Sequence, residues 1–401
     1  MGFLMRPAAR RLALAAALAF TAGCASTPYR FEEHAESDLT LALRQDETQV
    51  ERGKPNAWVD GFGHYFFSLP SKLILLDWDV NDHDVSPEVE RALEEYLRRN
   101  GLCNTKVRLN QYAPGGEWRR LVKNREMPGG WRFTLGVLSV SFYTIFPERL
   151  FAGFPIIGGG DHFNPYTNTI SIYSDVRPIV LHEGGHAKDF GDFENRHWKG
   201  VYAGLRAIPF LGLLVALYQE AVASNDALSW ELATAGSPES KAAYRTLYPA
   251  YGTYLGGAAQ TGTSLFVDGW ILYAVQFGVV VVGHVAGQTR ALFVRDRAEG
   301  LEPELLEAAA PDPHAGAVPT GTDTPPRPAC PEPTSDPAAA EASAAAPGSE
   351  TPGSDAPATE GSDTPGADAP ATDAATTDAP GADAPTTDTN AADESLGDPP
   401  L

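Results

Sequence analysis

The chain has 401 residues and a formal net charge of −22 at pH 7. The stretch from Leu301 onward holds 20 acidic residues and one basic residue, Arg327, so residues 1–300 carry a net charge of only −3. The sequence has no basic stripe, so nucleic-acid binding is not expected. Its three scattered cysteines are too few for a disulfide framework.

The N-terminus has the pattern of an export signal. Three arginines within the first eleven residues precede a short apolar run from Leu12 to Ala22, which is too short to span a bilayer. Thr21-Ala22-Gly23-Cys24 follows and resembles a bacterial lipobox. We therefore expect residues 1–24 to be a lipoprotein signal peptide, with Cys24 acylated and the protein facing the periplasm. An ordinary secretory signal cut near Ala22 is the alternative.

Residues 25–55 are polar and are expected to tether the body to the membrane. Residues 56–150 then read as a small N-terminal α+β unit. Its first strand is expected over the Leu- and Ile-rich run from Lys72 to Val80. Ser86 and Pro87 open an amphipathic helix that runs to Asn100, with Gly101 as its stop.

The rest of this unit is expected to be mainly strands. Val107 to Tyr112 alternates in polarity as a strand does. Residues 113–116, Ala-Pro-Gly-Gly, indicate a turn. The long β-favouring run from Phe133 to Phe146 suggests two further strands.

A second unit, residues 151–300, begins with a glycine triplet at 158–160. Residues 164–173 end in polar–apolar alternation, the pattern of an edge strand. They lie directly before the central motif of the chain. An extended substrate could pair with an edge strand in that position.

The central motif is His182-Glu183-Gly184-Gly185-His186. Two histidines four residues apart lie on one face of a helix, so both imidazoles can reach one metal ion, usually zinc. The intervening glutamate can then take a proton from a water molecule at the metal. Two glycines inside a helix cost about 1 kcal/mol each relative to alanine. They predict that another backbone or a substrate comes close to this turn.

The flanks of the motif favour a helix. Ser174 and Asp175 are capping residue types, Pro178 suits a first turn, and Gly191 can end the helix. Residues 192–200 then read as a polar loop, followed by one long apolar helix from Leu205 to Ala227.

That second helix carries Glu220 within Gln219-Glu220-Ala221-Val222-Ala223-Ser224. A carboxylate behind a run of Leu, Val and Ala is costly to bury unpaired, and a metal partner would explain it. Asp192, ten residues after His182, is an alternative third ligand, as in metzincin-type sites. Asp189 stands where such sites have a turn glycine, which favours Glu220.

His-Glu-x-x-His followed by a helix with Glu-x-x-Ala resembles the gluzincin metallopeptidases. It is most similar to the CAAX-protease-like and HtpX-like peptidases around the motif. The resemblance implies zinc held by His182, His186 and Glu220, with Glu183 as the base. Those families continue with an aspartate that steadies a zinc ligand, and here the position is Ser224. Asp189 or Asp226 could take that role instead.

The most hydrophobic run extends from Leu265 to Gly287, long enough to span a bilayer. Asp268, Gln276 and His284 interrupt it, which favours a buried helix or helix pair packed on the catalytic helices. Residues 311–401, rich in Pro, Ala, Thr, Gly and Asp, have almost no large apolar side chains and are expected to be a disordered acidic tail.

The sequence therefore predicts an α+β protein: an N-terminal α/β unit with an edge strand, then a mainly helical core around the motif. It would be a lipid-anchored zinc metallopeptidase of the cell envelope that cleaves protein or peptide substrates. A non-catalytic envelope lipoprotein with a structural scaffold, or a membrane-embedded component built on residues 265–287, are the alternatives. Three groups, Tyr202, Tyr251 and His284, are candidates to stabilise an oxyanion.

Overall fold

The computed structural model describes residues 29–31, 48–153, 160–264 and 269–295, all within the unit Met1–Pro333. The expected signal peptide with Cys24, and the expected acidic tail, lie outside the described residues. Cys103 is disulfide-bonded, and no other cysteine falls within the described ranges.

The described part of the chain is mainly helical with one small mixed sheet, so the expected α+β class is confirmed at that level. The sheet has the strand order β1-β2-β4-β3, and its strands are β1 (Val50–Arg52), β2 (Lys106–Leu109), β3 (His162–Asn164) and β4 (Thr169–Ile172). Strands β1, β2 and β4 run parallel, while β3 is antiparallel to β4. The sheet thus draws strands from both sides of residue 150.

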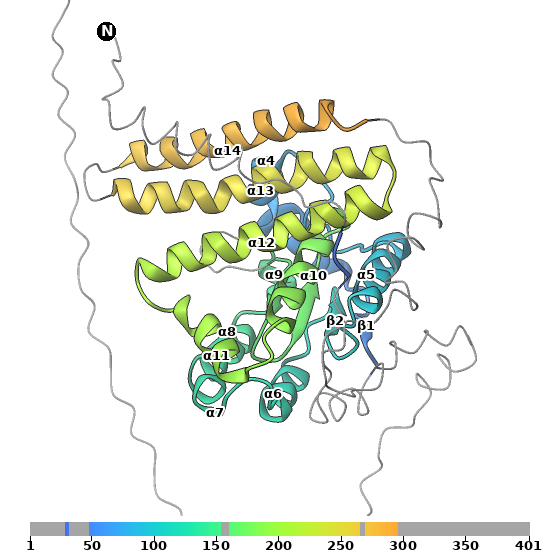
Figure 1. Ribbon diagram of the computed structural model, residues 1–401, viewed down its shortest axis with the longest axis vertical. Coiled ribbons are helices and arrows are strands. Elements are labelled where there is room, and N and C mark those ends of the chain that lie inside the picture. Colours follow the sequence, from blue (N-terminus) through green and yellow to red (C-terminus); the bar gives the residue numbers. More distant parts are fainter. Residues whose placement is uncertain (1–28, 32–47, 154–159, 265–268, 296–401) are drawn as a thin grey trace, which may run out of the picture. The chain divides into compact units, whose positions relative to one another are not determined.

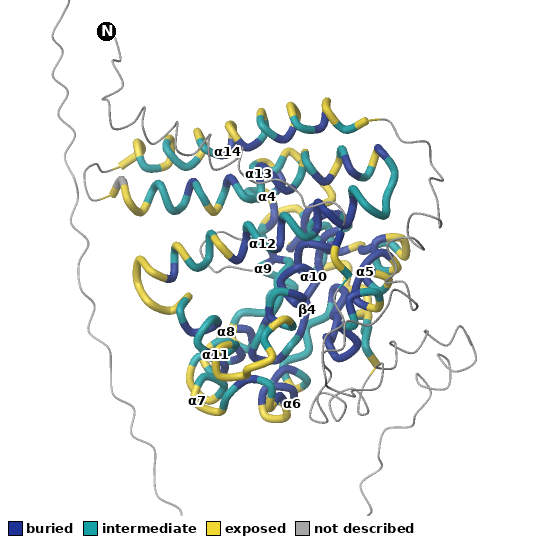
Figure 2. The backbone as a smooth tube through the Cα atoms, viewed as in Figure 1, coloured by how far each residue is buried: buried dark blue, intermediate teal, exposed yellow. Residues whose placement is uncertain are grey.

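Two helices pack near this sheet and against each other. α5 (Pro87–Arg99) begins at an N-cap, Ser86, whose side chain accepts a hydrogen bond from the Val89 amide. It ends before Gly101, which has a φ of 66°, so both predicted ends are confirmed. Its apolar face packs on α10 (Arg177–Gly191), the helix that carries the motif. Figure 2 shows α10 as one of the most buried elements.

Three long helices form a layer beside α10: α12 (Leu211–Thr234), α13 (Ser237–Thr263) and α14 (Trp270–Leu292). They follow one another along the chain and lie side by side in Figure 1. α12 packs on α10, α13 on α12, and α14 on α13. Glu220 therefore reaches the motif from a neighbouring helix.

The remaining elements are short. They are α3 (Ala57–Phe62), the π-helical turn η1 (Gly63–Phe67), α4 (Leu69–Leu75), α6 (Pro114–Lys123), α7 (Gly129–Trp131), the π-helical turn η2 (Arg132–Gly136), α8 (Val137–Ile145), α9 (Glu148–Phe151) and α11 (Arg196–Leu205).

The strand expected over residues 72–80 is wrong, because the chain forms α4 and then a series of turns there. Lys72 is buried in α4 and its Nζ donates to the carbonyl of Val80 at 2.6 Å. This bond closes the helix onto the turns that follow it. A short run of Leu and Ile fits either a helix or a strand, and here the tertiary contact decides.

Two further strand and turn predictions are also wrong. Residues 133–146 form η2 and α8 rather than strands, with Val140 and Tyr143 on a buried helical face. β-propensity depends on context, and no strand partner lies beside this run among the described residues. The turn expected at 113–116 is the first turn of α6, where Pro114 suits the helix start.

The strand before the motif is not an edge strand. β4 lies between β2 and β3, with Ile170 paired to Val107 on one side and Phe163 on the other. All four residues of β4 are buried, and both of its backbone edges are paired. Within the described residues, the outer strand on this side is β3.

Candidate metal centre

α10 begins at a different cap from the one expected. Its N-cap is Val176, and Pro178 lies in its first turn, as expected. The two expected caps bind elsewhere. Ser174 pairs with the carboxylate of Asp161, and Asp175 accepts from the amide of Ser86 at 2.8 Å. These bonds fix the loop between β4 and α10, and thereby the entry of the motif helix.

The two glycines of the motif lie where neighbouring elements approach the helix most closely. A Cβ atom on Gly184 would lie 2.7 Å from a ring carbon of Tyr96 in α5. A Cβ on Gly185 would lie 2.9 Å from the carbonyl oxygen of Ala223 in α12. The expectation of a close backbone approach is therefore confirmed at Gly185, and the approaching segment is the helix that carries Glu220.

The side chains of His182, His186 and Glu220 converge in one buried place. Glu220 Oε2 lies 3.1 Å from His182 Nε2 and 3.3 Å from His186 Nε2. One ligand atom from each residue lies within 4.8 Å of those of the other two. The three side chains are at most 10% exposed.

This donor set fits a metal ion. Ligands 2.0–2.1 Å from a tetrahedral zinc lie about 3.3 Å from one another. The two separations between imidazole nitrogens and the Glu220 oxygen are close to that value. Two neutral imidazoles and one carboxylate are also a ligand set that leaves one tetrahedral position for another molecule. The buried group could therefore hold a metal ion.

Asp192, the alternative third ligand, is not part of this group. It is the residue that follows Gly191 at the C-terminal end of α10. Glu220 instead enters from α12, which packs along α10. Among the described residues, Glu220 is the carboxylate that joins the two histidines.

The electrostatics of the group favour a cation. Burial alone would raise the pKa of the Glu220 carboxyl, but His186 and His182 outweigh it and hold that pKa well below its usual range. Burial would likewise lower the pKa of His186, yet the Glu220 carboxylate beside it raises that pKa above its ordinary value. A metal ion would replace the protons that the imidazoles otherwise hold.

The residue beside His182 Nδ1 is Ser224, whose Oγ lies 3.2 Å away. Ser224 follows Glu220 by one turn of α12, so the same helix supplies a ligand and a support. An acceptor at Nδ1 leaves Nε2 with the lone pair that a metal needs. The Ser224 side chain is thus placed to orient the His182 ring.

The two aspartates considered for this role bind other groups. Asp189 accepts from the hydroxyl of Tyr202 at 2.6 Å. Asp226 accepts from Lys188 Nζ at 2.9 Å and from the hydroxyl of Tyr29 at 2.8 Å. The Asp226 contacts fasten residues near the N-terminus to α10 and α12.

Glu183 is buried on α10, the helix that packs against β3. Its charge reaches two residues at the start of that strand. Burial and the negative charge of Glu183 raise the pKa of Asp161 to about 6, although hydrogen bonds from Ser174 and from the Tyr173 amide lower it. Glu183 also contributes, after Glu148, to a raised pKa of His162. The base candidate is thus close enough to Asp161 and His162 to affect the pKa of each.

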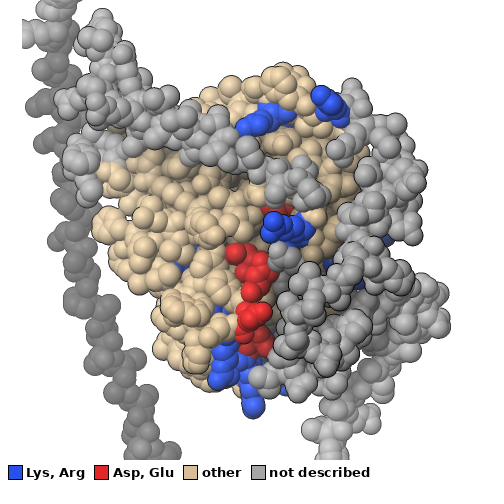
Figure 3. Space-filling view, in the orientation of Figure 1, with Lys and Arg blue, Asp and Glu red and all other residues tan. Residues whose placement is uncertain are grey.

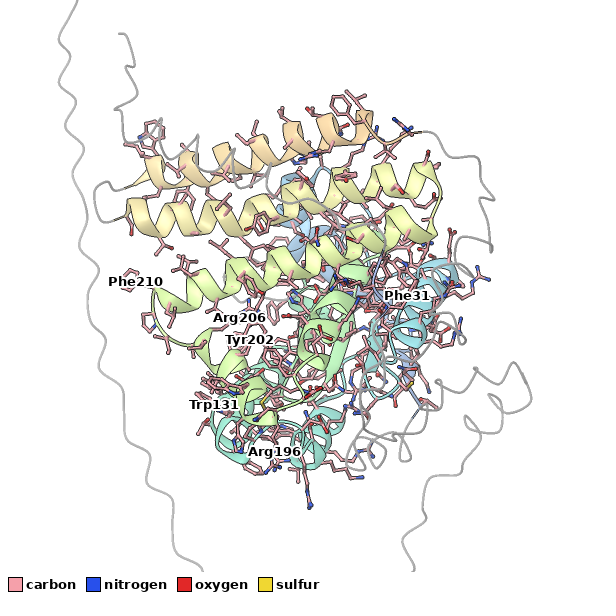
Figure 4. The ribbon with its side chains drawn as sticks, in the orientation of Figure 1. Phe31, Trp131, Arg196, Tyr202, Arg206 and Phe210 are labelled. Carbon is pink, nitrogen blue, oxygen red and sulfur yellow. The ribbon has the colours of Figure 1, made fainter. Side chains whose placement is uncertain are left out.

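Sequence reasoning missed two residues of the site. Arg206, in the link between α11 and α12, places Nη2 3.4 Å from Glu220 Oε1. Figure 4 shows it beside Tyr202, below α12. The negative charge of Glu220 also raises the pKa of the Tyr254 hydroxyl on α13, so the two groups lie near each other. Only the packing of α13 on α12 distinguishes Tyr254 from Tyr251, so no sequence signal marks it.

The three candidates for an oxyanion donor have other partners. The Tyr202 hydroxyl donates to Asp189, and that of Tyr251 donates to the Leu217 carbonyl at 3.4 Å. His284 Nε2 lies 2.9 Å from the Ile74 carbonyl. Arg206 is better placed, because its Nη2 lies 3.4 Å from Glu220 Oε1, and Tyr254 is close enough for the Glu220 charge to raise its pKa.

Comparison of the chain with protein families, with curated proteins and with solved structures finds no match, so the proposals that follow depend on the geometry of this site.

Proposed function

We propose that this chain is a zinc-dependent peptidase, exported and anchored to the cell envelope by a lipid on Cys24. The observation that carries the proposal is the convergence of His182 Nε2, His186 Nε2 and Glu220 Oε2, with Glu183 in the same helical turn as the histidines. A structural metal site would not need a second buried carboxylate, Glu183, beside the ligand Glu220.

His182, His186 and Glu220 would hold the zinc. When bound, zinc lowers the pKa of a water molecule to about 7 and polarises a carbonyl group. The Glu183 carboxylate accepts the proton of the attacking water and passes it to the leaving amine. The Tyr254 hydroxyl, which lies near Glu220, is the donor that we assign to the developing oxyanion.

The substrate is proposed to be an extended segment of protein. β3 is the outer strand of the sheet in the described residues, and it packs against α10 beside Glu183. A peptide that adds to β3 by backbone hydrogen bonds would pass over the metal group. The strand proposed to pair with the substrate is thus β3, residues 162–164, rather than β4, residues 169–172.

The Cys103 disulfide supports the export part of this proposal. Disulfides persist in oxidising compartments such as the periplasm and are rare in the cytosol. A disulfide at Cys103 would persist in a chain that is carried out of the cytosol.

Glu183→Gln tests the function. The amide keeps the volume but cannot accept a proton, so zinc content should stay at the wild-type level while cleavage of casein falls by about 10² or more. Glu95→Gln is the matched control, because Glu95 is a half-exposed carboxylate on α5. Cleavage by Glu183→Gln at the wild-type rate would contradict the assignment. Wild-type protein that holds zinc but cleaves no member of a peptide library would favour the scaffold alternative.

A further inference from the structure

The outward face of α14 is apolar from Trp270 to Val285. The exposed side chains recur every three or four residues and so lie on one side of the helix. Figure 2 shows this side facing away from α13. The large members are Trp270 (73% exposed), Tyr273 (61%), Phe277 (52%), Val281 (60%), Val285 (62%) and Leu292 (80%).

The inward face of α14 has the opposite character. Gly283 and Gly287 are buried against α13, where a Cβ would lie 2.8 Å from the Tyr248 carbonyl oxygen and 2.5 Å from that of Tyr244. His284 turns inward too, to the carbonyl of Ile74 in α4. A surface helix of a water-soluble domain places small and apolar residues inside and polar ones outside. α14 instead keeps its polar histidine inside and large apolar groups outside.

Charged residues are absent from most of α14 and from most of α13, which packs beside it. Residues 246–264 and 269–289 contain no Asp, Glu, Lys or Arg. Asp268 is the one charged residue between Arg245 and Arg290 in the sequence. Arg245 Nε donates to Gln288 Oε1 at 3.1 Å, so Arg245 and Arg290 lie at the same end of the helix pair. The uncharged surface in Figure 3 extends over α12 and α13.

The length of the apolar face fits a bilayer. α14 has 23 residues and is therefore about 34 Å long, against about 30 Å for the hydrocarbon core of a bilayer. Trp270 and Tyr273 lie at one end, and aromatic side chains of this kind favour the membrane interface. Glycines in the seam with α13 permit the close backbone packing that helices use within lipid.

We propose that the outward face of α14 contacts the hydrocarbon of a lipid bilayer. Length and hydropathy alone do not separate such a helix from a core helix. However, only 17% of the most apolar 18-residue segment of α14 is buried. A second copy of the chain is the other possible occupant. A protein interface has a polar rim around its apolar centre, whereas the exposed face of α14 stays apolar from Trp270 to Val285. The inference is independent of the metal site.

Site-specific photo-crosslinking tests this proposal. A diazirine-bearing amino acid replaces Val281 in the full chain, which is reconstituted into vesicles of phosphatidylethanolamine and phosphatidylglycerol. Val122 on α6 is the matched control, because it is a valine of almost equal exposure, 58% against 60%. Thermal unfolding of both labelled proteins confirms that they fold as the wild type does.

The expected result is at least tenfold more phospholipid adduct at position 281 than at position 122. The lipid on Cys24 brings both positions near the vesicle, so the ratio reports contact rather than tethering. Equal adducts at the two positions, or no adduct at position 281, would overturn the proposal. Crosslinks from position 281 to a second copy of the chain would show that α14 is a protein interface instead.

Discussion

Gly185→Ala tests how the packing of two helices sets the metal site. The new Cβ would lie 2.9 Å from the Ala223 carbonyl oxygen and 3.0 Å from its Cα, both backbone atoms of α12. Ordinary contact begins near 3.4 Å. α12 must therefore move away from α10 by about 0.5 Å, and Glu220, three residues before Ala223, moves with it.

Two effects on stability oppose each other in this variant. Alanine is favoured over glycine within a helix by about 1 kcal/mol, while overpacking a tight contact costs about 1–3 kcal/mol. We expect a net loss of about 0–2 kcal/mol in the free energy of unfolding of the metal-free protein. Metal sites tolerate about 0.2 Å in ligand position. Zinc affinity should therefore fall by about tenfold or more, beyond what the stability change explains.

Gly257→Ala in α13 is the matched control, because a Cβ there meets no atom within 4 Å. It should raise the free energy of unfolding by up to about 1 kcal/mol and leave zinc affinity unchanged. Urea unfolding of the chelated proteins measures stability, and competition with a chromogenic chelator measures zinc affinity. Wild-type zinc affinity in Gly185→Ala would refute the view that the α10–α12 contact sets the ligand geometry.

Three further predictions concern single side chains. Ser224→Ala removes the partner of His182 Nδ1 and should lower zinc affinity by about 10–100-fold. Ser224→Asp should preserve zinc affinity. Wild-type zinc affinity in Ser224→Ala would contradict the supporting role of Ser224. Burial raises the pKa of Glu148 from 4.5 to about 7, so its ionisation destabilises the fold as pH rises from 4.5 to 7. The free energy of unfolding of Glu148→Gln, measured in urea, should therefore rise relative to that of the wild type by up to about 3 kcal/mol between pH 5 and pH 8. A difference between the two proteins that does not change with pH would contradict this. Labelled palmitate should enter the wild type but not Cys24→Ser, and label retained by the variant would rule out the anchor at Cys24.

The core of the site could be predicted because local rules determine it. Spacing on a helix brings His182 and His186 to one face whatever the rest of the fold does. Glu220 could be inferred because a carboxylate within an apolar helix requires a partner. Tyr254 and Arg206 could not, since they reach Glu220 only through the packing of α13 and of the α11–α12 link.

The fold was predictable where chain ends carry their own signals. Ser86 and Gly101 bound α5 through capping and a left-handed φ, which are local effects. Residues 133–146 gave no such signal, and their β-favouring composition lost to the packing of Val140 and Tyr143. The order of the strands joins residues more than 50 positions apart, so no local pattern could show that β4 is internal.

The central claim is that Glu220, with the two histidines, holds one metal ion. Elemental analysis of the full chain measures it directly, with Glu220→Gln and Asp192→Asn compared under the same chelation. We expect one zinc per wild-type chain, most of it lost in Glu220→Gln because an amide oxygen is a weaker, uncharged ligand, and none lost in Asp192→Asn. Full zinc in Glu220→Gln together with loss in Asp192→Asn would contradict the account.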